Sequence, residues 1–426
     1  MLLSRGAGQH RHQLPAISTP LVEDLFGGMR QQRNRDVLPS GRLAHSVKSI
    51  YQISTALVSP VASYEPVLEV PTHFPSNAKR SGYHAVVAPT SNGGSSVGWP
   101  ARLSKARLHF VTGKGGTGKS TVAAALALTL AAGGRKVLLI EVEGRQGIAQ
   151  LFDVPPLPHQ ELKIATAEGG GQVNALAIDI EAAFLQYLDM FYNLGLAGRA
   201  MCRIGAIEFA TTIAPGLRDV LLTGKIKESA VRINKGTKNP VYDAIVVDAP
   251  PTGRIARFLD VTKAVSDLAK GGPVHSQSQG VVKLLHSGQT AIHLVTLLEA
   301  LPVQETLEAI KELADMELPI GSVIVNRNIP CHLGPHDLTK EAGGDVDADA
   351  VREGLAMAGI KLNDADFAGL LTETIQYATL ITTRAEAAQQ LDALQVSRLE
   401  LPAISGGVDL GSLYELSEFL AQQGVR

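Results

Sequence analysis

The sequence predicts an α/β fold in which a parallel β-sheet is covered by helices on both faces. From residue 105 onward, apolar runs of strand length alternate with segments of helical composition. The first of these runs leads directly into a glycine-rich loop and then a helix, which is the order of a strand–loop–helix unit in a parallel sheet. A longer helical stretch interrupts the alternation, and we expect a helical subdomain inserted at about residues 181–240.

The predicted elements begin with a strand at residues 107–112. An alanine- and leucine-rich helix follows at 119–132, and Gly133-Gly134 is a typical helix end because glycine adopts the left-handed conformation without strain. The second strand is expected at 136–142. Further apolar runs predict strands at 175–180, 244–247, 291–297 and 322–325.

The composition of the chain changes near residue 105. Residues 1–104 contain repeated prolines and scattered Arg and His with poor periodicity, so we expect a disordered N-terminal extension there. An organelle-targeting peptide, a dispensable tail or a start codon placed too far upstream are the alternatives for this extension. Residues 105–426 are expected to form the folded domain.

The whole-chain properties exclude several classes of function. The net charge of the 426 residues is −2, so no basic field favours nucleic acid as a partner. Two cysteines, Cys202 and Cys331, cannot form a disulfide framework, which suits a reducing compartment. The most apolar run, residues 122–132, is shorter than the ~20 residues needed to span a bilayer. We therefore expect a cytoplasmic protein with no nucleic-acid partner.

The stretch from 180 to 226 is rich in large apolar residues at helical spacing. Ordinary helix packing accounts for this pattern, and a groove for an apolar client or a partner subunit is the functional alternative. A mobile loop is expected beside it at residues 271–280, because of its glycines and proline. The residues that share the apolar helix face are Phe184, Tyr187, Leu188 and Phe191.

The motif that carries the chemistry is the loop of residues 113–120, which fits the pattern of a glycine, four residues and Gly-Lys-Ser. Its glycines let backbone N–H groups approach phosphate oxygens, and the helix that follows presents its positive N-terminal end. Lys119 would neutralise the β- and γ-phosphates, and the Ser120 hydroxyl would ligate Mg²⁺. The other phosphate-binding candidates are Gly113, Gly115, Gly116, Thr117, Gly118 and Thr121.

The second chemical element is the apolar strand that ends in Asp248. A carboxylate emerging at the carboxyl end of a parallel strand lies beside the phosphates, where it would hold Mg²⁺ through a water molecule. The loop of residues 249–253 would then respond to the γ-phosphate. Together the two elements predict a P-loop NTPase-like fold that binds ATP and Mg²⁺.

At this point a family resemblance becomes specific. Lys114-Gly-Gly-Thr-Gly-Lys-Ser resembles the deviant P-loop with a second lysine, and Asp248-Ala-Pro-Pro-Thr-Gly resembles the switch of the arsenite-pump and guided-entry (tail-anchored-protein targeting) ATPase family. The segments 297–306 and 325–327 are also similar to that family, over about residues 106–424. The mycobacterial-type anion transporter ATPases are the members that the chain resembles most.

The resemblance implies an ATP-hydrolysing dimer that couples its nucleotide state to a client or partner, either as a homodimer or as a hetero-dimer with a paralogous ATPase. Lys114 would act on the phosphates held by the other subunit, much as an arginine finger does. Asn326 and Arg327 would lie at the adenine, and the turn at 401–403, with Pro402, would wall the base. An apolar client or a membrane-protein partner fits the same resemblance.

The sequence departs from the family at the acidic residue that orients the attacking water. Glu143 occupies the position of the family's aspartate, and its carboxylate sits one methylene further from the backbone. We expect hydrolysis that is slow or that relies on a partner subunit, because a misplacement of about 1 Å costs on the order of 10²-fold in rate. The family's paired metal-binding cysteines are also missing, since Cys202 and Cys331 are isolated.

Two alternatives stay open at this stage. The first is a catalytically weak nucleotide-binding subunit of a hetero-dimer, which the Glu143 replacement favours. The second is a Min- or Par-like positioning ATPase, which shares the second lysine. Its membrane-binding members need a basic amphipathic terminal helix, whereas the last helix here carries Glu415 and Glu418.

Overall fold

The computed structural model describes residues 98–180, 182–183, 215–260 and 273–426. The described residues fall into two compact units: Cys331–Thr382 form the smaller one, and those up to Pro330 together with Thr383–Arg426 form the larger one. The expectation of a single domain over 105–426 did not anticipate this division.

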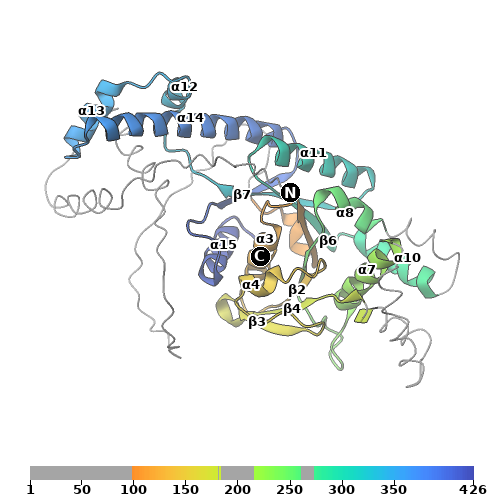
Figure 1. Ribbon diagram of the computed structural model, residues 1–426. Coiled ribbons are helices and arrows are strands. Elements are labelled where there is room, and N and C mark those ends of the chain that lie inside the picture. Colours follow the sequence, from red (N-terminus) through yellow and green to blue (C-terminus); the bar gives the residue numbers. More distant parts are fainter. Residues whose placement is uncertain (1–97, 181, 184–214, 261–272) are drawn as a thin grey trace, which may run out of the picture. The chain divides into compact units, whose positions relative to one another are not determined.

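Eight strands among the described residues form one sheet in the larger unit (Figure 1). The strand order is β3-β4-β2-β5-β1-β6-β7-β8, and every neighbouring pair is parallel except the antiparallel pair of β3 and β4. The strands are β1 (Leu108–Gly113), β2 (Lys136–Glu141), β3 (Leu162–Thr166), β4 (Gln172–Ala177), β5 (Ala244–Asp248), β6 (Thr290–Thr296), β7 (Ile320–Asn328) and β8 (Ser397–Pro402).

Helices cover both faces of this sheet (Figure 1). One core lies between the sheet and α7, α8, α10, α11 and the end of α14, and the other lies between the sheet and α3, α4 and α15. The elements are η1 (Ala101–Lys105), α3 (Lys119–Ala131), α4 (Gly147–Leu151), η2 (Glu168–Gly170), α7 (Pro215–Val231), α8 (Thr252–Leu259), α10 (Pro273–Leu285), α11 (Ala300–Asp315), α14 (Asp364–Asp392) and α15 (Leu410–Gln422).

The predicted fold class is confirmed, with helices on both faces of a mostly parallel sheet. Each predicted strand is present with ends shifted by a few residues, but the sequence did not reveal β3 or β8. Both are edge strands. Edge strands bury fewer side chains and so carry a weaker apolar signal. The last two residues of β8 were expected to be a turn at 401–403, and this prediction is wrong because Leu401 and Pro402 still belong to the strand.

The structure corrects two further expectations. Residues 215–231 of the predicted insertion are helical in α7, but the chain then turns back through a bridge between Ile233 and Pro240, so its last part is not helical. The mobile loop expected at residues 271–280 is wrong from residue 273 onward, since α10 begins there. Proline at the first position of a helix is favourable, because the N–H it lacks has no partner in the first turn. The apolar face of Phe184, Tyr187, Leu188 and Phe191 lies outside the described residues, as do residues 1–97 and Cys202.

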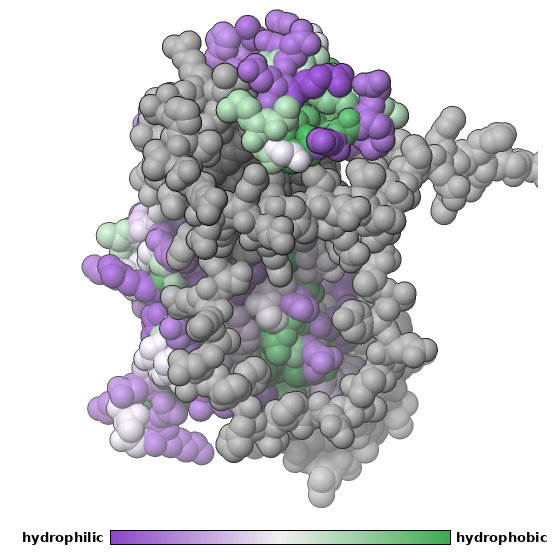
Figure 2. All heavy atoms as spheres, turned by 90° about the vertical axis from the view of Figure 1, so that its left-hand side faces the viewer, coloured by the Kyte–Doolittle hydropathy of each residue, from purple (hydrophilic) through white to green (hydrophobic). Residues whose placement is uncertain are grey.

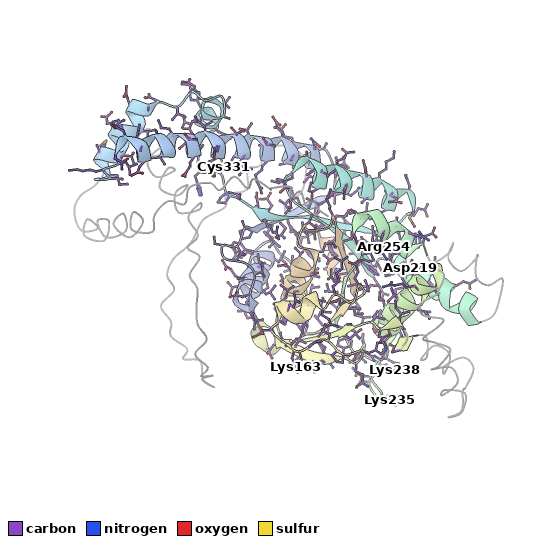
Figure 3. All side chains as sticks on the ribbon, viewed as in Figure 1. Lys163, Asp219, Lys235, Lys238, Arg254 and Cys331 are labelled. Carbon is purple, nitrogen blue, oxygen red and sulfur yellow. The ribbon has the colours of Figure 1, made fainter. Side chains whose placement is uncertain are left out.

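The smaller unit contains α12 (Pro335–Ala342), α13 (Ala348–Met357) and the first part of α14. Its core is small and consists of Val351, Leu355 and Phe367, with the Arg352 guanidinium 4.1 Å above the Phe367 ring. On the surface of this unit, hydrophilic side chains surround a smaller hydrophobic group (Figure 2). Cys331 is free and exposed (Figure 3), and the described residues hold no group of His, Cys, Asp and Glu that would bind a metal ion.

Within the described ranges, no helix combines the length and the apolar composition that crossing a membrane requires.

Two fully buried histidines link the central strands at the end of the sheet away from the glycine loop. Ser322 N–H donates to His293 Nδ1, so His293 carries its proton on Nε2 and donates to His109 Nδ1 at 3.1 Å. His109 Nε2 then donates to the Ala106 carbonyl. Burial lowers the pKa of His109 to about 4 and lowers that of His293 well below its usual value, which the nearby Arg102 charge reinforces. Both rings are therefore neutral at pH 7.

This pair predicts that the protein loses stability as the pH falls. Both rings stay neutral in the folded chain but take up protons in the unfolded chain below pH 6.5, so the unfolding free energy falls between pH 6.5 and about 4. Each ring contributes up to about 1.4 kcal/mol per pH unit. Urea unfolding of wild type and His109→Gln should show a shallower pH dependence in the variant. His336→Ala, at an exposed position, is the control, and equal slopes in wild type and His109→Gln would contradict the prediction.

Candidate functional site

The glycine loop joins β1 to α3 at the centre of the sheet, as the sequence predicts. Gly113 approaches β6 so closely that a Cβ there would lie 2.2 Å from the Val295 carbonyl oxygen. Gly118 has φ +88°, and a Cβ there would meet the Asn326 amide nitrogen at 2.3 Å. These two positions therefore exclude larger residues. Gly115 and Gly116 face open space, so their backbone is accessible to a phosphate chain.

The Ser120 hydroxyl and the Asp248 carboxylate meet at the carboxyl ends of β1 and β5. Ser120 Oγ donates to Asp248 Oδ2 at 2.6 Å. Burial raises the pKa of Asp248 to about 6, although the hydrogen bond from Ser120 and the charge of Lys119 lower it. A hydroxyl and a carboxylate oxygen are ligands that Mg²⁺ prefers, directly or through water. The two predicted metal residues are thus brought together.

Lys119, the first residue of α3, is half-buried in the same place. Burial lowers the pKa of its ammonium group, and the negative charges of Asp248 and Glu143 oppose this shift. A desolvated ammonium group at a helix N-terminus attracts an anion more strongly than an exposed lysine does. Thr121 is half-buried in the first turn of the same helix, and the Thr117 hydroxyl donates to the Lys114 carbonyl across the loop.

Lys114 does not point toward the residues around Lys119. Its ammonium group lies 2.7 Å from Glu305 Oε1 on α11, with the two side chains 26% and 34% exposed. The other Glu305 oxygen accepts a hydrogen bond from Thr252, the first residue of α8. One carboxylate therefore links the glycine loop, the segment after Asp248 and α11. This ion pair was not predicted, although Glu305 lies in one of the segments that carried the family resemblance.

Two acidic residues, Glu141 at the end of β2 and Glu143 just after it, have different contacts in the structure. Glu141 is 2% exposed and accepts hydrogen bonds from the Gln146 and Ile148 N–H groups, so it caps α4. Of these two glutamates, Glu143 is the one whose charge acts on Lys119, together with Asp248. Its carboxylate is paired with Arg254 at 3.3 Å and with Arg145 at 3.4 Å.

Arg254 lies in the first turn of α8, close to Asp219 of α7 (Figure 3). Burial raises the pKa of the Asp219 carboxyl, and the Arg254 charge opposes this shift. Arg254 was not among the residues predicted from sequence. Its place directly after the loop of residues 249–253 is the signal that would have drawn attention to it.

The predicted base-side residues lie at the carboxyl ends of β7 and β8. Asn326 is 4% exposed, and its amide group donates to the Thr117 carbonyl of the glycine loop at 2.9 Å. Arg327 has an exposed side chain and a left-handed backbone with φ 52°. Pro402 pairs with Asn328 at the end of β8. The structure thus brings Asn326 against the loop, whereas the Arg327 side chain faces solvent.

This combination of a parallel sheet, a glycine loop between β1 and α3, and an aspartate at the end of β5 defines a P-loop nucleotide-binding protein. Comparison with known proteins gives the family. A family model described as anion-transporting ATPase matches residues 106–283. The ATPase BagA of Mycobacterium tuberculosis is 86% identical over 341 residues, which cover 80% of this chain and 100% of that protein.

More distant relatives agree with this result. The arsenical pump-driving ATPase of Escherichia coli is 26% identical over 343 residues, covering 70% of this chain and 53% of that protein. The ATPase ASNA1 homolog of Entamoeba dispar is 23% identical over 263 residues, covering 52% of this chain and 76% of that protein. The chain belongs to the anion-transporting ATPase family, which confirms the resemblance that the sequence motifs carried.

Proposed function

We propose that the protein is an ATP-hydrolysing switch that works as a dimer and couples its nucleotide state to a client or partner. This proposal rests on the different surroundings of Lys114 and Lys119, the two lysines of the glycine loop. Lys119 is half-buried near Asp248 and Glu143, where it serves the phosphates of its own subunit. Lys114 is paired with Glu305 on α11 instead, and on leaving Glu305 it would act on a nucleotide bound by another subunit.

The residues present fit ATP and Mg²⁺. The open backbone at Gly115 and Gly116, together with the N-terminus of α3, would hold the phosphates. Ser120 would ligate Mg²⁺ directly, and Asp248 would do so through water. Mg²⁺ would supply charge neutralisation between the β- and γ-phosphates, and Glu143 would orient the attacking water.

The Glu143 ion pairs favour a second candidate function, a nucleotide-binding subunit with little hydrolysis of its own. The two arginines set the orientation of this carboxylate and compete with the attacking water for its lone pairs, which would slow hydrolysis. The positioning-ATPase alternative has less support, because the apolar side of α15 packs into the core through Leu413, Leu416 and Leu420. That face is therefore not available for a membrane surface.

A paired measurement tests these proposals. The full chain is sedimented with and without ATP and Mg²⁺, and phosphate release is followed in the same samples. We expect ATP-dependent self-association together with slow turnover, both of which disappear when EDTA removes Mg²⁺. A monomer that binds ATP without turnover would favour the weak subunit instead, and co-sedimentation with liposomes in ATP would favour the positioning ATPase. Absence of ATP binding would contradict all three.

A further inference from the structure

Arg384, near the end of α14, is a buried arginine at the carboxyl end of β7. It is only 7% exposed, and burial lowers the pKa of its guanidinium group, which the charge of Glu299 opposes. Burying a cation is unfavourable unless its contacts compensate. The contacts that Arg384 makes among the described residues are to a carbonyl and an amide oxygen rather than to a carboxylate.

These contacts act on two adjacent residues of β7. Arg384 Nη2 donates to the Arg327 carbonyl at 2.9 Å and lies 3.4 Å from Asn328 Oδ1. The Nε atom of Arg384 is buried and has no hydrogen-bond partner in the described part of the chain. The guanidinium group is therefore aimed at the backbone of the strand end and leaves one of its own donors unsatisfied.

The strand bends at the point where Arg384 holds it. Arg327 has φ 52°, a left-handed conformation that is unfavourable for a residue with a side chain. The register between β7 and β8 shifts between Val325 and Asn328. A hydrogen bond to the Arg327 carbonyl fixes the orientation of the peptide that follows this residue, so it stabilises the bend.

The two sides of the bend carry the two walls of the proposed base site. Before it, Asn326 donates to the Thr117 carbonyl of the glycine loop. After it, the side-chain amide of Asn328 donates to Glu400 Oε2 at 2.8 Å. The backbone carbonyl of Asn328 accepts a hydrogen bond from the Ala403 N–H at 2.9 Å. The second pair of contacts fixes the end of β8, where Pro402 lies.

We propose that Arg384 is a positioning residue for nucleotide-base recognition, which holds the bend of β7 so that Asn326 and Pro402 stand at the right separation to enclose the base. This inference rests on the proposed nucleotide site, because it names a residue that shapes one side of it. Arg384 makes none of its described contacts with the glycine loop. Its loss should therefore weaken binding of the base and leave binding of the phosphates unchanged.

Binding of ATP and of inorganic tripolyphosphate, each with Mg²⁺, separates the two effects by calorimetry. For Arg384→Met we expect the Kd for ATP to rise by about tenfold, since a buried charged hydrogen-bond donor is lost. The Kd for tripolyphosphate should stay within about twofold, and Arg384→Lys should partly restore ATP binding. Glu386→Ala, at an exposed position on the same helix, is the control.

Asn328→Ala is the second variant, because it removes one acceptor of Arg384 and the link to Glu400 without leaving a buried charge unpaired. We expect a smaller loss of ATP affinity and none for tripolyphosphate. Equal weakening of both ligands in the folded variants, or no weakening of ATP, would overturn the positioning role. Failure of the wild-type chain to bind ATP would overturn the proposed function itself, which distinguishes the two failures.

Discussion

Replacement of Lys114 by alanine is expected to lower ATP turnover by about 10³-fold, because a cation supplied in trans to the transferred phosphoryl group is worth that much or more. ATP binding to the monomer should change little, since Lys119 and the backbone of the glycine loop still hold the phosphates of the same subunit. Phosphate release and nucleotide affinity, measured on one preparation, check both parts. ATP-dependent self-association should be lost along with turnover.

The ion pair between Lys114 and Glu305 provides a second variant that tests the same role of Lys114. Lys114 is bound to Glu305 in the structure, so transfer of its ammonium group to the other subunit must break that contact. Glu305→Gln should therefore favour ATP-dependent association, by at most about fivefold per subunit for an ion pair this exposed. Lys311→Ala, at an exposed position on α11, is the matched control. Loss of ATP binding itself in Lys114→Ala would place this lysine in the site of its own subunit and contradict the action in trans.

The central part of the fold could be predicted because its signals are local. A run such as residues 244–248 is apolar because the strand is buried, and the pattern of Gly113–Ser120 needs no knowledge of the rest of the chain. Edge strand β3 lacks such a signal, because no residue in it is fully buried. The loop expected at the start of α10 shows the limit of glycine and proline as loop signals, since Pro273 begins a helix.

The residues of the candidate site also fall into two groups, those that local sequence signals predict and those that they do not. Lys119, Ser120 and Asp248 could be predicted, because each lies next to a strand end whose position the sequence gives. Glu305 and Arg384 could not, because their roles depend on contacts between residues 191 and 57 positions apart. A sequence does not display such pairs unless the packing of α11 and α14 on the sheet is already known. The roles in trans and at the base remain predictions for the same reason.

Replacement of Glu143 by glutamine is expected to abolish most turnover while sparing ATP binding. The amide has nearly the same shape as the carboxylate but cannot accept a proton or orient water as strongly, which costs about 10²-fold or more in rate. The Kd for ATP should stay within about twofold, because Gly113–Lys119 is untouched. Steady-state phosphate release that equals that of wild type would contradict the assignment of Glu143.

Glu143 also forms an ion pair with Arg254 of α8, so it can act as a structural anchor for that helix. Measuring turnover in an Arg254 variant beside Glu143→Gln separates this structural role from catalysis. If Glu143 served only to anchor α8 through Arg254, Arg254→Gln would lower turnover as much as Glu143→Gln does. If Glu143 orients water, Arg254→Gln frees the carboxylate and lowers turnover by less than about tenfold, as expected for a rim ion pair. Arg145→Gln is the matched control, since Arg145 is the other partner of Glu143 and is 76% exposed. We expect the second outcome, because the charge of Glu143 acts on Lys119. Glu141 does not act on Lys119, and its carboxylate caps α4.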